Sequence, residues 1–252
     1  MRILATYNIK GGVGKTAAAV NLAYLAARRG ERTLLWDLDP QAAATYYFRV
    51  EPKVVGGGQR LLKGGKKGSA LDDVIKGTDF PGLDLVPADF SFRNLDLMLE
   101  EAKGSTKQLR KLLRPLEDDY DVVFLDCPPS ISLVSESAFR ASDALLVPVI
   151  PTTLSARTLE QLLDFLASQE RLATLKVLPF FSMVDRRKRL HLESMAELPI
   201  RWPQFLRTSI PYASDVERMG VHRMPLPAYA PLSPAAVAYQ SLWGEVRASL
   251  PK

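Results

Sequence analysis

The sequence contains very little cysteine and histidine. Its 252 residues include one cysteine, Cys127, and two histidines, His191 and His222. A single cysteine excludes an internal disulfide, and two histidines in separate segments do not form the ligand spacing of a zinc site. We therefore expect Cys127 to be a small buried residue, and any metal ion to arrive with a ligand.

Long hydrophobic runs are also missing. No stretch of about 18 apolar residues occurs, and the opening residues MRILATYNIKGG lead directly into a glycine-rich motif without the features of a signal peptide. We therefore expect a soluble, cytoplasmic protein. Hydrophobic residues make up 47% of the chain, which favours one large α/β domain over residues 1–252.

The charge balance is mildly basic. The net charge is +5, and the sequence pI is near 9.3. An excess of this size is compatible with binding to nucleic acid or to an anionic membrane surface, but it requires neither.

Short apolar segments alternate with helical patterns along the chain. That alternation predicts a mainly parallel, twisted sheet with helices on both faces. The expected strands are residues 2–8, 32–38, 83–88, 121–126, 144–150 and 175–183. A segment rich in glycine and lysine, at about 51–69, has little apolar periodicity, and we expect it to be a surface excursion.

Two helices have clear buried faces. Leucines recur at helical spacing in one, and an aromatic and aliphatic stripe marks the last helix. Ser233 and Pro234 provide its start signal, a capping side chain followed by a preset φ. The buried faces are Leu159, Leu162, Leu163 and Leu166 in the first, and Tyr239, Leu242, Trp243 and Val246 in the second.

A phosphate-binding loop follows the first predicted strand. The segment KGGVGKTA lies between that strand and an apolar helix expected over 17–29, as a Walker A motif requires. Backbone N–H groups of such a loop surround phosphate oxygens, and the helix N-terminus adds its positive end. The expected nucleotide-binding residues here are Gly11, Gly12, Val13, Gly14, Lys15, Thr16 and Ala17. Lys15 would reach the β- and γ-phosphates, and Thr16 would coordinate Mg²⁺.

Aspartates end two of the predicted strands. The run VVFLD ends at Asp126, and WDLDPQ contains Asp37 and Asp39. A phosphate loop is completed by a metal-side carboxylate on a neighbouring strand, so we expect Asp126 to bind Mg²⁺. Because Asp37 and Asp39 alternate, one can orient water while the other supports the metal or the loop.

Four segments, in this order, resemble the ParA/MinD family of deviant-Walker ATPases, and in particular its short ParA/Soj type. They are KGGVGKT, DLDPQAAAT, FLDCPPS and TSIPY. The resemblance covers nearly the whole chain. It implies that ATP and Mg²⁺ are the cofactors, that ATP binding produces a homodimer, and that a partner stimulates slow hydrolysis.

The resemblance also implies roles for single residues. Lys10 would be the signature lysine, which reaches the phosphates bound by the other subunit, as an arginine finger does in trans. Asp39 would position the attacking water and Asp37 would belong to the Mg²⁺ surround. Pro211 would line the adenine pocket, and Asp185 would lie at the base or the dimer face. The catalytic set is then Lys10, Lys15 and Asp39.

Two segments depart from the family pattern. The usual DPQGN is replaced by DPQAA, and because alanine favours helix, we expect the helix after Gln41 to begin early. Soj-like chains read IPRNVRLSEAP where this chain reads IPYASDVERMG, so Tyr212 and Asp215 replace two arginines.

The remaining basic residues suggest that the ATP-bound protein binds DNA. The ParA-type interpretation predicts ATP-gated binding to DNA of any sequence, an activator of the ParB or cargo-adaptor kind, and a nucleoid-associated location. A cluster of this kind can also be only a solvated charged surface. The candidate DNA-binding residues are Arg186, Arg187, Lys188, Arg189, Arg218 and Arg223.

Two other functions stay open. A MinD-like ATPase would bind a membrane through a C-terminal amphipathic helix, but the last helix has little positive charge and is better suited to pack on the sheet. A metabolic enzyme of the dethiobiotin synthetase or cobyrinate amidase type would not need Lys10 in trans.

Overall fold

Seven strands form one sheet in the computed structural model of the chain, in which residues 1–54, 57–58, 71–101 and 105–250 are described. The order across the sheet is β3-β4-β2-β5-β1-β6-β7. The strands are β1 (Arg2–Thr6), β2 (Thr33–Asp37), β3 (Lys76–Gly77), β4 (Leu83–Val86), β5 (Val122–Asp126), β6 (Ala144–Val149) and β7 (Lys176–Phe181). Neighbours are parallel except β3 and β4. The predicted fold class is thereby confirmed.

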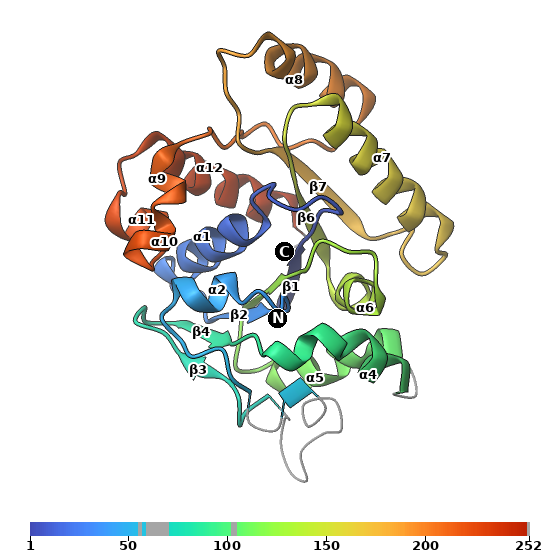
Figure 1. The fold of residues 1–252 in the computed structure, drawn as a ribbon, viewed down its shortest axis with the longest axis vertical. Helices are drawn as coiled ribbons and strands as arrows, with labels where there is room; N and C mark the ends of the chain where they lie inside the picture. The colour runs from blue at the N-terminus through green and yellow to red at the C-terminus, as the bar shows by residue number, and fades with distance from the viewer. Residues whose placement is uncertain (55–56, 59–70, 102–104, 251–252) are drawn as a thin grey trace.

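Helices connect the parallel strands and cover both faces of the sheet (Figure 1). The longer ones are α1 (Lys15–Arg28), α6 (Leu133–Ala141), α7 (Thr153–Ser168), α8 (Arg189–Arg201) and α12 (Pro234–Ser249). The shorter helices are α2 (Ala43–Tyr47), α4 (Leu95–Glu101), α5 (Gln108–Leu113), α9 (Ser214–Glu217), α10 (Met219–His222) and α11 (Leu226–Tyr229), with 3-10 turns η1 (Phe90–Asn94), η2 (Ser105–Lys107) and η3 (Arg114–Leu116).

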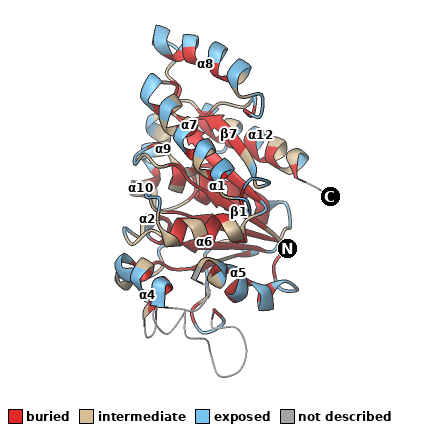
Figure 2. Cartoon of the chain, turned by 90° about the vertical axis from the view of Figure 1, so that its right-hand side faces the viewer, coloured by how far each residue is buried: buried red, intermediate tan, exposed pale blue. Residues whose placement is uncertain are grey.

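Each face of the sheet carries its own hydrophobic core. Alternate residues of a strand point to opposite faces, so Ile3 and Ala5 of β1 join one core and Leu4 joins the other. The first core includes residues of α4, α5, α6 and α7. The second includes residues of α1, α10, α11 and α12. Figure 2 shows the sheet as the buried centre between these helices, while much of α8 is exposed.

The expected helices form with the expected buried faces. Leu163 is only partly buried, beside the three other leucines of the predicted α7 face, and the whole α12 stripe is buried. Helix α12 begins at Pro234, with the Ser233 side chain accepting a hydrogen bond from the N–H of Ala236. Its apolar face is therefore covered by the sheet and by α1. This is the packing on the sheet that we expected for the last helix. No helix among the described residues is long and apolar enough to cross a membrane.

Two features differ from the sequence-based expectation. Strand β3 was not predicted; it has only two residues, both exposed, and pairs antiparallel with β4. Helix α2 includes Ala43 but not Ala42, because Ala42 takes a left-handed backbone conformation with φ 56°. Most of the glycine- and lysine-rich segment at about 51–69 lies outside the described residues.

Candidate nucleotide-binding site

The glycine-rich loop connects β1 to α1 and is bent by two glycines in the left-handed region. Gly12 has φ 70° and Gly14 has φ 92°, values that side chains with a Cβ rarely adopt. A Cβ on Gly14 would also lie 2.9 Å from the hydroxyl oxygen of Ser182. Lys15 begins α1 directly after this turn, so the first N–H groups of the helix face the loop.

The Lys15 side chain folds over the glycine-rich loop. Its ammonium donates a hydrogen bond to the backbone oxygen of Lys10 at 3.2 Å, and the residue is only 6% exposed. Burial lowers the pKa of Lys15, while the nearby carboxylates of Asp126 and Asp39 act in the opposite direction. A buried cation at a helix N-terminus is a strong attraction for a phosphate group.

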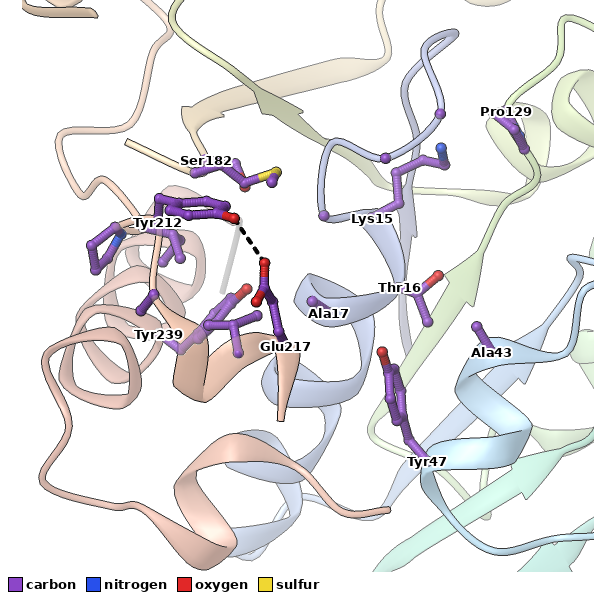
Figure 3. Close-up of a pocket in the computed structure, with 18 of the residues that line it drawn as sticks. Lys15, Thr16, Ala17, Ala43, Tyr47, Pro129, Ser182, Tyr212, Glu217 and Tyr239 are labelled. Carbon is purple, nitrogen blue, oxygen red and sulfur yellow. Dashed lines mark hydrogen bonds between the residues drawn. The ribbon is translucent and has the colours of Figure 1, made fainter. Parts of the chain in front are cut away.

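A cavity of about 370 Å³ opens beside the loop (Figure 3). Of the residues predicted from the sequence, its lining includes Gly11, Gly12, Gly14, Lys15, Thr16, Ala17, Asp39 and Pro211. Val13 does not line it; this side chain is fully buried. The prediction missed further lining residues, which come from loops, from short helices and from α12. Among them are Ala43, Tyr47, Pro129, Ser182, Tyr212, Glu217 and Tyr239.

Asp37 and Asp126 lie side by side beneath the loop. They occupy paired positions at the ends of β2 and β5, and both are completely buried. Asp37 Oδ2 accepts hydrogen bonds from the backbone N–H of Thr45 at 2.8 Å and from its hydroxyl at 2.7 Å. Asp37 Oδ1 accepts from the backbone N–H of Asp39 at 3.2 Å. Asp37 therefore fixes the start of α2.

Asp126 is less well satisfied. Its Oδ1 accepts a hydrogen bond of 3.3 Å from the Thr6 hydroxyl, whereas its Oδ2 is buried without a hydrogen-bond partner among the described residues. Burial raises the pKa of Asp126 well above its usual value, the charge of Asp37 raises it further, and the nearby Thr16 hydroxyl opposes the rise. Burial likewise raises the pKa of Asp37 to about 6.

These groups fit a magnesium ion that is held mainly by a nucleotide. An unpartnered carboxylate oxygen next to a threonine hydroxyl is a suitable pair of hard oxygen ligands. The described residues contain no group of three or more histidine, cysteine, aspartate or glutamate side chains that could hold a metal alone. Mg²⁺ in phosphate-transfer sites uses one or two carboxylates together with substrate phosphates, which agrees with this donor set.

Asp39 lies in the wall of the cavity, whereas Lys10 lies outside it. Asp39 lines the cavity, and its Oδ1 accepts from the N–H of Gln41 at 2.9 Å. Lys10 is partly exposed and does not line the described cavity. Its backbone N–H donates to Asn8 Oδ1 at 2.9 Å, but its ammonium has no ion pair or hydrogen bond to any described residue.

The other end of the cavity is formed by the chain after β7. The backbone N–H of Tyr212 donates to the oxygen of Val184 at 2.9 Å, and a parallel bridge joins Val184 to Pro211. This pairing holds Pro211 and Tyr212 against the cavity, opposite the loop. The Tyr212 hydroxyl donates to Glu217 Oε1 at 2.8 Å.

The six basic residues proposed for DNA divide into two groups. Three of them have partners: Arg187 pairs with Asp185 and Arg189 with Glu193, while Arg223 lies over the ring of Tyr46. The other three are exposed and have no ion pair with a described carboxylate; they are Arg186, Lys188 and Arg218. Cys127 is buried, as expected, and burial raises the pKa of its thiol.

Known proteins are similar to this chain in sequence and in fold. The family model described as an AAA domain matches residues 1–176. The sporulation initiation inhibitor protein Soj of Bacillus subtilis is 31% identical over 252 residues, covering 98% of this chain and 99% of Soj. The chromosome partitioning protein ParA of Caulobacter vibrioides is 36% identical over 157 residues, 59% of this chain and 56% of ParA.

A solved structure of a nucleotide-binding enzyme is also similar to this chain. Cobyrinic acid a,c-diamide synthase from Mycobacterium smegmatis, bound to an ATP analogue and magnesium, has a TM-score of 0.81 at 26% identity, over 98% of this chain and 94% of the other. The sheet and the phosphate loop thus define a P-loop ATPase. Within that class, the chain belongs to the ParA/MinD family. The expected cofactors, ATP and Mg²⁺, match the ligands of the related structure.

Proposed function

We propose that this protein is an ATP-dependent dimerising ATPase that positions a cargo through ATP-gated binding to non-specific DNA. The observation that carries the proposal is the contrast between its two loop lysines. Lys15 is buried over its own loop, whereas the Lys10 ammonium has no partner among the described residues and lies outside its own cavity. A cation held in this way is available to the nucleotide of a second copy.

The chemistry assigned to the chain follows from this arrangement. Mg²⁺ would neutralise charge on the β- and γ-phosphates and would be held by Thr16 and the free oxygen of Asp126. Lys15 binds phosphate oxygens from its own subunit, and Asp39 orients the attacking water from the rim of the cavity. Lys10 of the second copy adds positive charge where negative charge accumulates. Asp37 supports this machinery by holding α2 in place.

The DNA-binding face is proposed to lie on the loop before α8 and near α9. Arg186, Lys188 and Arg218 are exposed and free of ion pairs with described carboxylates, so they can neutralise phosphates without first losing a partner. Since Arg187, Arg189 and Arg223 already have partners, we expect them to contribute less.

An activator of the ParB or cargo-adaptor kind would stimulate hydrolysis, and the protein would be cytoplasmic and associated with the nucleoid. The name of the Caulobacter relative, a chromosome partitioning protein, supports this assignment.

The test is a DNA-binding titration in the two nucleotide states. Asp39→Ala protein, expected to accumulate as the ATP-bound dimer, is titrated into a fluorescent random-sequence duplex in Mg·ATP and in Mg·ADP, at low and moderate salt. Binding should require ATP, and if about four phosphates are neutralised, log K should fall with log salt at a slope of about −3 to −4. Arg186→Ala combined with Lys188→Ala should weaken binding, while Arg189→Ala, whose side chain is paired with Glu193, should weaken it less. Dimerisation without DNA binding in either state would contradict the proposed partner.

A metabolic amide-forming reaction is the second candidate, because a diamide synthase has a TM-score of 0.81 to this chain at 26% identity. Such an enzyme forms ADP only when its carboxylate substrate is present. ATP turnover stimulated by DNA and an activator protein, without an added small carboxylate, would favour the positioning function.

A further inference from the structure

The adenine end of the cavity holds one carboxylate, that of Glu217. Apart from Glu217, the cavity lining contains one acidic residue among the described residues, Asp39, which follows β2 close to the phosphate loop. Figure 3 shows the Glu217 carboxylate between Tyr212 and Ala17, on the side of the cavity away from Lys15. With phosphates bound at the loop, the base would therefore lie against Glu217.

One carboxylate oxygen of Glu217 accepts a hydrogen bond from another side chain, and the other oxygen accepts none from the described residues. Its Oε1 accepts the hydrogen bond from the Tyr212 hydroxyl at 2.8 Å. Its Oε2 has no hydrogen-bond partner among the described residues. Pro211, Ala213 and Val216, which also line the cavity, are apolar and offer no donor. Oε2 is thus the carboxylate oxygen that is open to the base.

We propose that Glu217 selects the base of the nucleotide by accepting a hydrogen bond from the exocyclic 6-amino group of adenine, and that Tyr212 is the positioning residue for this carboxylate. The proposal rests on the nucleotide-binding function proposed above and adds a specificity determinant to the same site. Adenine offers an amine at position 6, whereas guanine offers a carbonyl oxygen there, which a carboxylate repels.

Tyr212 also sets how many donors the carboxylate can accept. Guanine can satisfy a carboxylate through two adjacent donors, N1–H and the 2-amino group, but this requires both carboxylate oxygens. The Tyr212 hydroxyl donates to Oε1, so a base that needs both carboxylate oxygens has to share Oε1 with the tyrosine. One free oxygen suits the single amine of adenine and disfavours the paired donors of guanine.

The test compares nucleotides that differ only at the base. Competition against a fluorescent ATP analogue gives affinities for ATP, for purine riboside 5′-triphosphate, which lacks the 6-amino group, and for GTP. The wild-type protein should bind the purine riboside compound about tenfold more weakly than ATP, the size expected for one hydrogen bond to a charged group. Glu217→Ala should bind the two equally. Glu170→Ala, at an exposed glutamate outside the cavity lining, should retain the wild-type difference.

A second variant tests the tyrosine. Tyr212→Phe keeps the ring but removes the hydroxyl, so Oε1 no longer has to be shared, and GTP affinity should rise about fivefold or more while ATP affinity changes less than about threefold. A Glu217→Ala protein that still prefers ATP over purine riboside triphosphate would overturn the proposal while leaving ATP binding intact. Failure of wild-type protein to bind any of the three nucleotides, with Lys15→Ala indistinguishable from it, would instead overturn the nucleotide-binding function itself.

Discussion

Asp37 and Asp126 lie at paired positions on β2 and β5, yet only Asp126 retains a carboxylate oxygen without a hydrogen-bond partner among the described residues. Thr45 and the backbone of Asp39 occupy both oxygens of Asp37. We therefore expect the two aspartates, which are similar in sequence context, to have different tasks: Asp126 would offer an oxygen to a metal, whereas Asp37 anchors α2.

Replacing each aspartate by asparagine should separate these tasks. Asp126→Asn removes a buried, poorly satisfied carboxylate, so the protein without Mg²⁺ should unfold at an equal or higher temperature. Its affinity for ATP in the presence of Mg²⁺ should fall by about tenfold or more, because a metal ligand is lost. Thermal unfolding with and without Mg²⁺, together with calorimetric titration of ATP, measures both quantities.

Asp37→Asn is the matched control, with the opposite expectation. An amide has one acceptor oxygen, so it cannot accept all three hydrogen bonds that Asp37 receives, and the buried N–H and hydroxyl of Thr45 compete for it. The free energy of unfolding should fall by about 1–3 kcal/mol. An Asp126→Asn protein that is destabilised as strongly as Asp37→Asn would contradict the division of tasks.

The phosphate loop should not tolerate a side chain at Gly14. Gly14→Ala places a Cβ 2.9 Å from the Ser182 hydroxyl and forces alanine to adopt φ 92°. A left-handed residue with a Cβ costs about 1–2 kcal/mol, so urea unfolding should show a loss of that size, and ATP affinity should fall as the loop shifts. Gly244→Ala is the control, since no atom lies within 4 Å of a Cβ built there and the residue is inside α12. That change should leave ATP binding unaltered.

The sequence predicted the parts of the structure that depend on local patterns. The six parallel strands are apolar runs, and α12 begins at a serine followed by proline, so both signals lie within a few residues. The Walker A loop is likewise contiguous, and Asp37, Asp39 and Asp126 each end or follow a recognisable strand. Strand β3 lacked such a signal, because Lys76 and Gly77 are both exposed and carry no apolar alternation.

The missed site residues depend on contacts between distant segments. Ser182 approaches Gly14 across the sheet, and Thr45 is identified only by its hydrogen bonds to Asp37 and to the N–H of Ala88. Glu217 lies in a short helix whose sequence suggests a solvated carboxylate, and its place in the cavity follows from the pairing of Val184 with Pro211. Hydrogen bonds of this kind have no sequence periodicity, so pattern analysis does not find them.

The ion pair between Arg32 and Asp121 predicts a pH dependence of stability. Hydrogen bonds from the Arg32 side chain and backbone lower the pKa of Asp121 to about 2, below the value of about 3.9 for an unfolded chain. A lowered pKa stabilises the folded state above the unfolded pKa, and this contribution disappears as the pH falls from about 4 toward about 2. Asp121→Asn should therefore be less stable than wild type at pH 7, and the difference should shrink in that acid range. Asp164→Asn, at an exposed aspartate of α7 away from this pair, should show no such convergence.

The trans role of Lys10 can be tested by mixing two inactive variants. Lys10→Ala should bind ATP but fail to hydrolyse it, because Lys15, Thr16 and Asp126 are unchanged while the cation from the second copy is missing. Asp39→Ala should also bind ATP without turnover, because its water is not oriented.

In a mixed dimer, the Asp39→Ala subunit supplies an intact Lys10 to a subunit that has an intact Asp39. If Lys10 acts in trans, phosphate release should reappear on mixing and follow the amount of mixed dimer. If Lys10 acts within its own subunit, neither site in the mixed dimer is complete and the mixture stays inactive. Wild-type turnover by Lys10→Ala alone would exclude both roles.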